Sequence, residues 1–268
     1  MAIFFQASVT PATACLERNS FLMHDKIEPQ NRTSNLSAWL FLFAFAYAFM
    51  HVVPAFLTHD IKNGLTTGDL LNFFTPFVVI PLVWKLYFVI RATRSPADRT
   101  VRFATVILFF SSIFYINGQG MNLSANAIAR HLVGMEQTPL YWLNYFFDEK
   151  MGHIFWHSGM LGISISLLLL AANLQSIPTS WVTLAGAPFY SFAYFTDAVE
   201  GQTVVLLFPS AVLILGGILR HAKKQQNSLK RNPVMLFFLV GYIIAVALFL
   251  IWWIWQGGFP QFSELGWV

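Results

Sequence analysis

The chain has 268 residues, of which 56% are hydrophobic and only 10% are charged, and its mean hydropathy is +0.59. Soluble domains carry about 25% charged residues, so this composition excludes an ordinary soluble enzyme. The formal net charge of +4 does not indicate nucleic-acid binding, because the Lys and Arg residues lie in short stretches between apolar runs. The composition predicts an all-α, polytopic membrane helix bundle.

Residues 1–35 precede the first long apolar run and are predicted to form a cytoplasmic N-terminal tail. This tail contains Cys15, the single cysteine of the chain. One cysteine can form neither an intramolecular disulfide nor a cysteine-based zinc site. We therefore interpret Cys15 as a free thiol.

Seven apolar runs follow, each close to the about 20 helical residues that cross the hydrocarbon core of a bilayer. They are Leu36–Leu57, Gly68–Ile90, Arg102–Gln119, Phe147–Leu174, Ser180–Gly201, Thr203–Arg220 and Pro233–Gln256. Residues 36–256 thus form a predicted seven-helix transmembrane domain, and residues 257–268 form a C-terminal tail. The fifth and sixth spans are separate only if Glu200, Gly201 and Gln202 make a very tight hairpin.

The distribution of Lys and Arg predicts the orientation of these spans. Twelve Lys and Arg residues lie in the N-terminal tail and in the loops after the second and sixth spans. The loops on the opposite side contain only Lys62 and Arg130. Cytoplasmic loops carry an excess of basic residues. We therefore predict a cytoplasmic N-terminus and an extracytoplasmic C-terminus, in the plasma (inner) membrane.

Ionisable residues inside apolar runs are informative because each costs about 2.5–3.5 kcal/mol at the centre of a membrane helix. Glu149, His153 and His157 stand at i, i+4 and i+8 in the fourth span, so they share one helix face. A carboxylate and two imidazoles in one column can share a metal ion or relay a proton. Asp148 points to a different face and could orient a ligand. Alternatively, Asp148 and Glu149 are first-turn acids favoured by the helix dipole.

A second acidic pair, Asp197 and Glu200, lies at i, i+3 near the end of the fifth span. The competing interpretation is a polar turn between two helices. On the first span, His51 is followed by Pro54, which should interrupt the helix. A single interfacial histidine with a structural role is the alternative for His51.

Amide side chains gather beyond the third span, in the longest loop. Asn117 lies near the end of that span, and Asn122 and Asn126 share one face of a short interfacial or re-entrant helix expected over Asn122–Leu132. Amides at membrane depth hydrogen-bond across helices. Helix–helix contact is therefore the competing interpretation for these amides.

All of these groups are predicted at the extracytoplasmic ends of their spans, although the orientation was assigned from Lys and Arg alone. Their nitrogen and oxygen donors suit zinc, iron or manganese. The predicted metal ligands are Glu149, His153, His157 and Asp197; the predicted catalytic carboxylates are Glu200 and Asp148; and the predicted polar support comes from Asn117, Asn122, Asn126 and His51. Zinc is the best match to these donors, and iron is possible.

A zinc ion lowers the pKa of its bound water and presents hydroxide to an ester or amide. We therefore predict a metal-dependent, hydrolase-like enzyme that acts on a membrane lipid or lipid-linked molecule. An iron-dependent oxidoreductase is the weaker enzyme alternative, because the seven histidines include no adjacent pair. The alternative class is a transporter or a proton- or ion-binding membrane protein that uses the same acids and histidines. The apolar inner halves of the spans favour an enzyme. The oligomeric state is not indicated.

Overall fold

The computed structural model describes residues 36–95, 98–172, 174, 177–225 and 229–267. The predicted N-terminal tail, with Cys15, lies outside these residues. In chain order the described elements are a first helix over residues 36–52, η1 (Val53–Phe56), β1 (Asp60–Lys62), β2 (Leu65–Thr66), α2 (Thr67–Arg91), α3 (Arg99–Ala129), α4 (Pro139–Tyr145), the π-helical segment η2 (Phe146–Gly152), α5 (His153–Ala171), α6 (Trp181–Glu200), α7 (Val204–Gln225), η3 (Leu229–Arg231) and α8 (Pro233–Gln256).

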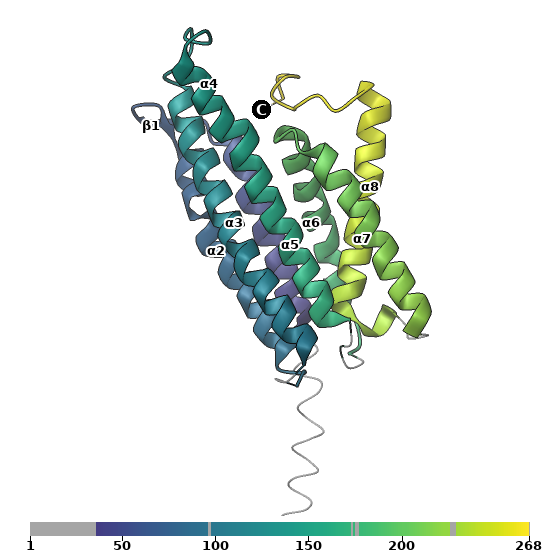
Figure 1. Cartoon of the computed structure of the whole chain (residues 1–268). Helices are drawn as coiled ribbons and strands as arrows, with labels where there is room; N and C mark the ends of the chain where they lie inside the picture. Colours follow the sequence, from purple (N-terminus) through teal and green to yellow (C-terminus); the bar gives the residue numbers. More distant parts are fainter. Residues whose placement is uncertain (1–35, 96–97, 173, 175–176, 226–228, 268) are drawn as a thin grey trace, which may run out of the picture.

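The long helices run side by side in one bundle (Figure 1). Among the described residues, six helices are long and apolar enough to cross a membrane: Leu36–Phe56, Thr67–Arg91, Arg99–Ala129, Pro139–Ala171, Val204–Lys224 and Pro233–Gln256. The less apolar α6 has 20 residues, a length of about 30 Å, and completes the bundle. Large apolar side chains face outward, such as Phe77 at 65% and Val205 at 87% exposure. The chain is a multi-pass integral membrane protein, as predicted.

The first helix contacts two of its neighbours directly, α6 and α2. On α6, a Cβ added at Gly186 would lie 3.0 Å from Cα of Phe41. On α2, the Thr75 hydroxyl donates to the carbonyl oxygen of Met50. Close to Pro54 the helix changes to the 3₁₀ turn η1, so the interruption expected from this proline is present. Together these contacts bring the polar end of the first helix into the interior of the bundle.

Two predicted boundaries were wrong at the polar end. α3 continues to Ala129 instead of ending at Gln119, so Asn122 and Asn126 lie on the last turns of a membrane helix rather than on a separate short helix. The fourth span begins at Pro139, where the Thr138 side chain caps the helix by accepting from the Tyr141 backbone N–H. Amides and acids at these ends are held by neighbouring helices, which allows both helices to extend beyond the apolar run.

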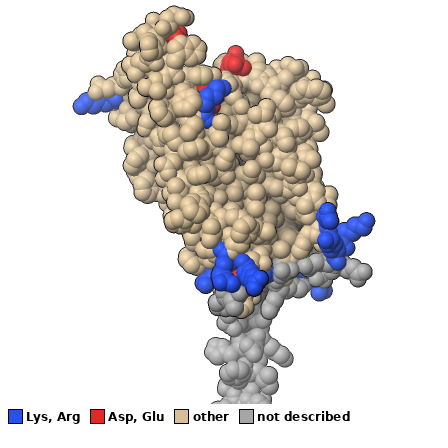
Figure 2. Space-filling model, viewed as in Figure 1, with Lys and Arg blue, Asp and Glu red and all other residues tan. Residues whose placement is uncertain are grey.

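Basic residues gather at one end of the bundle. Figure 2 shows Lys and Arg concentrated near the end of α2, the start of α3 and the end of α7, with few at the opposite end. This end includes Arg91 in the last turn of α2 and Lys223 and Lys224 in the last turn of α7. The structure thus separates a basic end from a polar, acid-bearing end. Which end faces the cytoplasm stays a prediction.

Glycines allow a very close approach between α3 and the helical run η2–α5. A Cβ added at Gly118 would lie 2.2 Å from the backbone nitrogen of Trp156, and a Cβ at Gly159 would lie 2.4 Å from the backbone nitrogen of Tyr115. Small residues at such contacts let two membrane helices pack backbone to backbone. This contact sets the spacing between the polar residues of α3 and those of α5.

We expect Gly118→Ala to destabilise the bundle, because the added methyl meets backbone atoms that cannot rotate away. Overpacking of this kind costs about 1–3 kcal/mol. Gly120→Ala is the matched control, since nothing lies within 4 Å of a Cβ at Gly120 and alanine favours a helix. Thermal unfolding in detergent should give a lower midpoint for Gly118→Ala than for Gly120→Ala. Equal midpoints would show that the two helices are not tightly packed.

Candidate functional site

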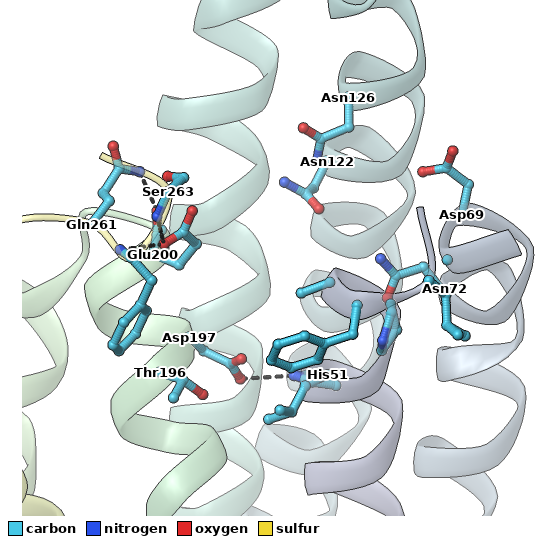
Figure 3. Close-up of a pocket in the computed structure, with 18 of the residues that line it drawn as sticks. His51, Asp69, Asn72, Asn122, Asn126, Thr196, Asp197, Glu200, Gln261 and Ser263 are labelled. Atoms are coloured by element: carbon cyan, nitrogen blue, oxygen red, sulfur yellow. Dashed lines mark hydrogen bonds and ion pairs between the residues drawn. The ribbon is translucent and has the colours of Figure 1, made fainter. Parts of the chain in front are cut away.

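A cavity of about 1100 Å³ opens between the helices at the end remote from the basic cluster of Figure 2. We call it the polar-end cavity. Its polar lining includes His51, Asp69, Asn72, Asn122, Asn126, Arg130, Glu149, His153, Asp197 and Glu200. Its aromatic lining consists of Phe56, Trp156, Phe192, Phe195, Trp252, Phe262 and Trp267. Figure 3 shows how the labelled polar side chains approach one space from several helices.

The structure brings seven of the ten predicted site residues to this cavity: His51, Asn122, Asn126, Glu149, His153, Asp197 and Glu200. The other three lie elsewhere. Asp148 and His157 are buried next to lining residues. Asn117 lies on the exposed face of α3, and its amide donates to the Ile113 carbonyl of the same helix. The expected support from Asn117 is therefore absent from the cavity.

His51 and Asp197 form a buried pair at the floor of the cavity. His51 Nδ1 lies 2.7 Å from Asp197 Oδ2, and the Tyr47 hydroxyl donates to the same oxygen at 2.7 Å. Because a carboxylate only accepts hydrogen bonds, Nδ1 carries the proton and Nε2 faces the Tyr115 hydroxyl at 2.7 Å. Asp197 thus orients an imidazole through Oδ2, a role that differs from the predicted metal ligand.

Glu149 and His153 form a second pair, which the predicted helical column placed together correctly. Glu149 Oε2 lies 3.6 Å from His153 Nδ1. The Asn122 amide nitrogen lies 2.8 Å from His153 Nε2 and donates to Asp148 at 2.8 Å. Since Nε2 accepts from Asn122, the proton of a neutral His153 lies on Nδ1 and faces Glu149. Asp148 therefore positions Asn122 instead of acting as a base in the cavity.

His157 continues the column but is shielded from the cavity by the α6–α7 turn. Its ring stacks on His153 with centroids 5.7 Å apart, and Nδ1 lies 2.5 Å from the Thr203 hydroxyl. A Cβ added at Gly201 would lie 2.7 Å from Cε1 of His157 and 3.0 Å from Cγ of His153. The tight hairpin predicted at Glu200–Gln202 is thus present, and it packs directly on both imidazoles.

Glu200 holds the C-terminal segment across the cavity. Its Oε2 accepts from the backbone N–H groups of Phe262 at 2.8 Å and of Ser263 at 3.3 Å. Gln261 donates to the Glu200 carbonyl and also accepts from the Gln202 amide at 3.0 Å. Because its charge is used to anchor this segment, the predicted role of Glu200 as a catalytic base does not match its surroundings.

Sequence reasoning missed an ion pair at the cavity rim. Arg130 contacts both carboxylate oxygens of Asp69 at 2.5 and 2.9 Å, and it donates to the carbonyl of Gly64 in the β1–β2 hairpin. The Asp69 carboxylate raises the pKa of the Arg130 guanidinium. Asp69 also completes a capping box with Thr66, and the spacing Thr66-x-x-Asp69 was a usable sequence signal for a helix start.

The residues present supply half of the predicted metal site. Two ligands of a tetrahedral zinc ion, each about 2.0–2.1 Å from the metal, lie about 3.4 Å apart, close to the 3.6 Å between Glu149 Oε2 and His153 Nδ1. Within the described ranges, however, no group of three or more His, Cys, Asp or Glu side chains is arranged to hold a metal ion. The four predicted ligands separate because Asp197 pairs with His51 and His157 turns toward Thr203.

Comparison with known proteins gives one similarity. The chain is 22% identical over 217 residues to ceroid-lipofuscinosis neuronal protein 6 of Homo sapiens, covering 72% of this chain and 66% of that protein's own length. No family model matches the chain, and no solved structure matches it. The name of the human protein states no reaction, metal or substrate.

We expect Asp197→Ala to destabilise the protein strongly, because Tyr47 and His51 would lose their shared acceptor in a buried place. Removing one partner of a buried pair costs about 3–5 kcal/mol. Glu136→Ala, which removes an exposed carboxylate from the α3–α4 loop, should change stability little. Unfolding midpoints in detergent measure both. An Asp197→Ala variant as stable as the parent would mean that this pair does not hold the floor of the cavity.

Proposed function

We propose that the protein is a hydrolase-like membrane enzyme whose substrate is a lipid or lipid-linked molecule bound in the polar-end cavity. The observation that carries the proposal is the Glu149–His153 pair, whose facing atoms Oε2 and Nδ1 have no hydrogen-bond partner, on the wall of a large, partly aromatic cavity. We further propose that the protein lies in the plasma membrane and that the cavity opens on its extracytoplasmic side, as predicted from the basic residues.

The lining of the cavity supports an amphipathic occupant. Ligand pockets of about 300–1,000 Å³ hold a drug-sized molecule and combine apolar walls with a few polar groups. Here the tryptophans Trp156, Trp252 and Trp267 share the space with the acids and amides. Tryptophan is favoured where one part of a site is apolar and another is wet. A lipid satisfies both parts, with its chain on the rings and its headgroup at the polar residues.

The chemistry proposed for the pair follows from its protonation. The Glu149 carboxylate lines the cavity and has no hydrogen-bond donor at Oε2, so it can take a proton from a water that attacks an ester or amide and return that proton to the leaving group. Because Asn122 contacts Nε2, a neutral His153 keeps its proton on Nδ1. It can donate this hydrogen bond to the carbonyl oxygen of the ester or amide, which gains negative charge when the water attacks. Glu149 thus replaces Glu200 and Asp148 as the proposed base, because those two carboxylates are engaged elsewhere.

We expect Thr196→Trp to abolish lipid binding, since Thr196 lines the cavity and the larger side chain fills it. Val205→Trp, on the lipid-facing surface, is the control. Mass spectrometry of lipid bound to purified protein measures occupancy, and conversion of that lipid measures activity. At saturating lipid, Glu149→Gln should lower the rate by about 10²–10⁴-fold.

These measurements separate the parts of the proposal. A parent chain without bound lipid would refute the proposal as a whole. Binding without conversion would remove the enzymatic part, and transport of the molecule into liposomes would then favour the transporter alternative.

A divalent metal, zinc before iron, is the alternative form of the proposal, in which Glu149 and His153 would hold the ion instead of transferring protons. Metal analysis of the purified chain should then find about one ion per chain, lost in His153→Ala and retained in His131→Ala. His131 is suitable as the control because it is exposed and contacts the carbonyl of Asn63 in the hairpin. An ion content that is unchanged in His153→Ala would exclude this site.

A further inference from the structure

The charged residues that line the polar-end cavity are mostly acidic. The carboxylates are Asp60, Asp69, Glu149, Asp197 and Glu200, and the guanidinium is Arg130. With neutral histidines this leaves a formal excess of four negative charges around one space. A divalent ion at Glu149 and His153 would offset only half of that excess. The cavity lining therefore keeps an excess of negative charge whether or not the cavity holds a metal.

Among the lining acids of the membrane helices, local partners leave one carboxylate open to a ligand, whereas Asp60 lies in the exposed hairpin. Asp69 is paired with Arg130, and Glu200 accepts backbone N–H groups. Glu149, in contrast, has a side chain that is 20% exposed, and its Oε2 has no donor. The group that faces Glu149 Oε2 is the imidazole of His153, 3.6 Å away. An uncompensated carboxylate at membrane depth is costly, and a cationic occupant would remove that cost.

Two further observations point to a polar, positively charged occupant. His153 lines the cavity with a side chain only 9% exposed, and its buried Nδ1 has no hydrogen-bond partner, which indicates a polar ligand. Trp156, Trp252 and Trp267 line the same cavity, and indole faces attract ammonium groups. Carboxylates with tryptophan faces are suited to an ammonium group and unsuited to a phosphate, which would meet like charges.

We infer that the occupant of the polar-end cavity carries a positively charged amine headgroup, and that Glu149 is its counterion. This inference rests on the proposed function, because it names the headgroup of the lipid or lipid-linked molecule bound there. The amine donates to the partly exposed Glu149 carboxylate, and the hydrocarbon chain lies along the aromatic lining. Lipids with an anionic phosphate headgroup are excluded by the excess of carboxylates.

Three amphiphiles that share the same hydrocarbon chain and differ only in headgroup test the inference. They are a long-chain alkylamine, its uncharged N-acetyl amide and the corresponding alkyl phosphate. Equilibrium dialysis against the purified full chain in non-ionic detergent measures their affinities, with and without a chelator. We expect the amine to bind at least about tenfold more tightly than the phosphate. Glu149→Gln should remove most of this preference while the amide binds as before, which also shows that the variant is folded.

Glu136→Gln is the matched control, because it removes one carboxylate from an exposed loop outside the cavity lining. It should leave all three affinities unchanged. An alkyl phosphate that binds as tightly as the amine, or an amine preference that survives Glu149→Gln, would overturn the inference but leave lipid binding intact. If none of the three binds and Thr196→Trp has no effect on bound lipid, the proposed function itself fails.

Discussion

The backbone contact between α3 and the η2–α5 run determines where the polar groups of this protein lie. At Gly118 and Gly159 a single methyl group would meet backbone atoms of the opposite helix, so the two helices pack backbone to backbone with no room for a side chain between them. Asn122 lies one turn beyond Gly118, and this close approach lets its amide contact both Asp148 and His153. The orientation and the proton position of His153 are therefore consequences of helix packing.

The bundle and much of its polar end could be predicted, because their signals are local. Apolar runs of about 20 residues define membrane helices, and a spacing of four residues places Glu149 next to His153. The tight hairpin at Gly201 was also foreseen from its short polar sequence. The acids and amides occur at the same end of their spans in the sequence, and this indicated at which end of the bundle the cavity lies.

Pairing across the bundle could not be predicted, because it depends on helix rotation. No sequence pattern indicates that Asp197 would accept from Tyr47 and His51, or that His157 would turn toward Thr203. The tyrosines gave no signal at all, since they occur within apolar runs as ordinary core residues. The extension of α3 to Ala129 was missed because its last turns are polar and are satisfied only by neighbouring elements.

The unequal lengths of the helices have a consequence for the surrounding bilayer. α3 has 31 residues and the continuous run Pro139–Ala171 has 33, or about 46 and 50 Å, whereas α6 and α7 have 20 and 22. In Figure 1 the half with α3 and α4 rises above the half with α6 and α7. A bilayer matched to the short half leaves the tall half protruding, and fractions of a kcal/mol per Å of mismatch make this geometry sensitive to thickness. Acyl-chain length and sterol content would then regulate how deeply the cavity mouth sits among the headgroups.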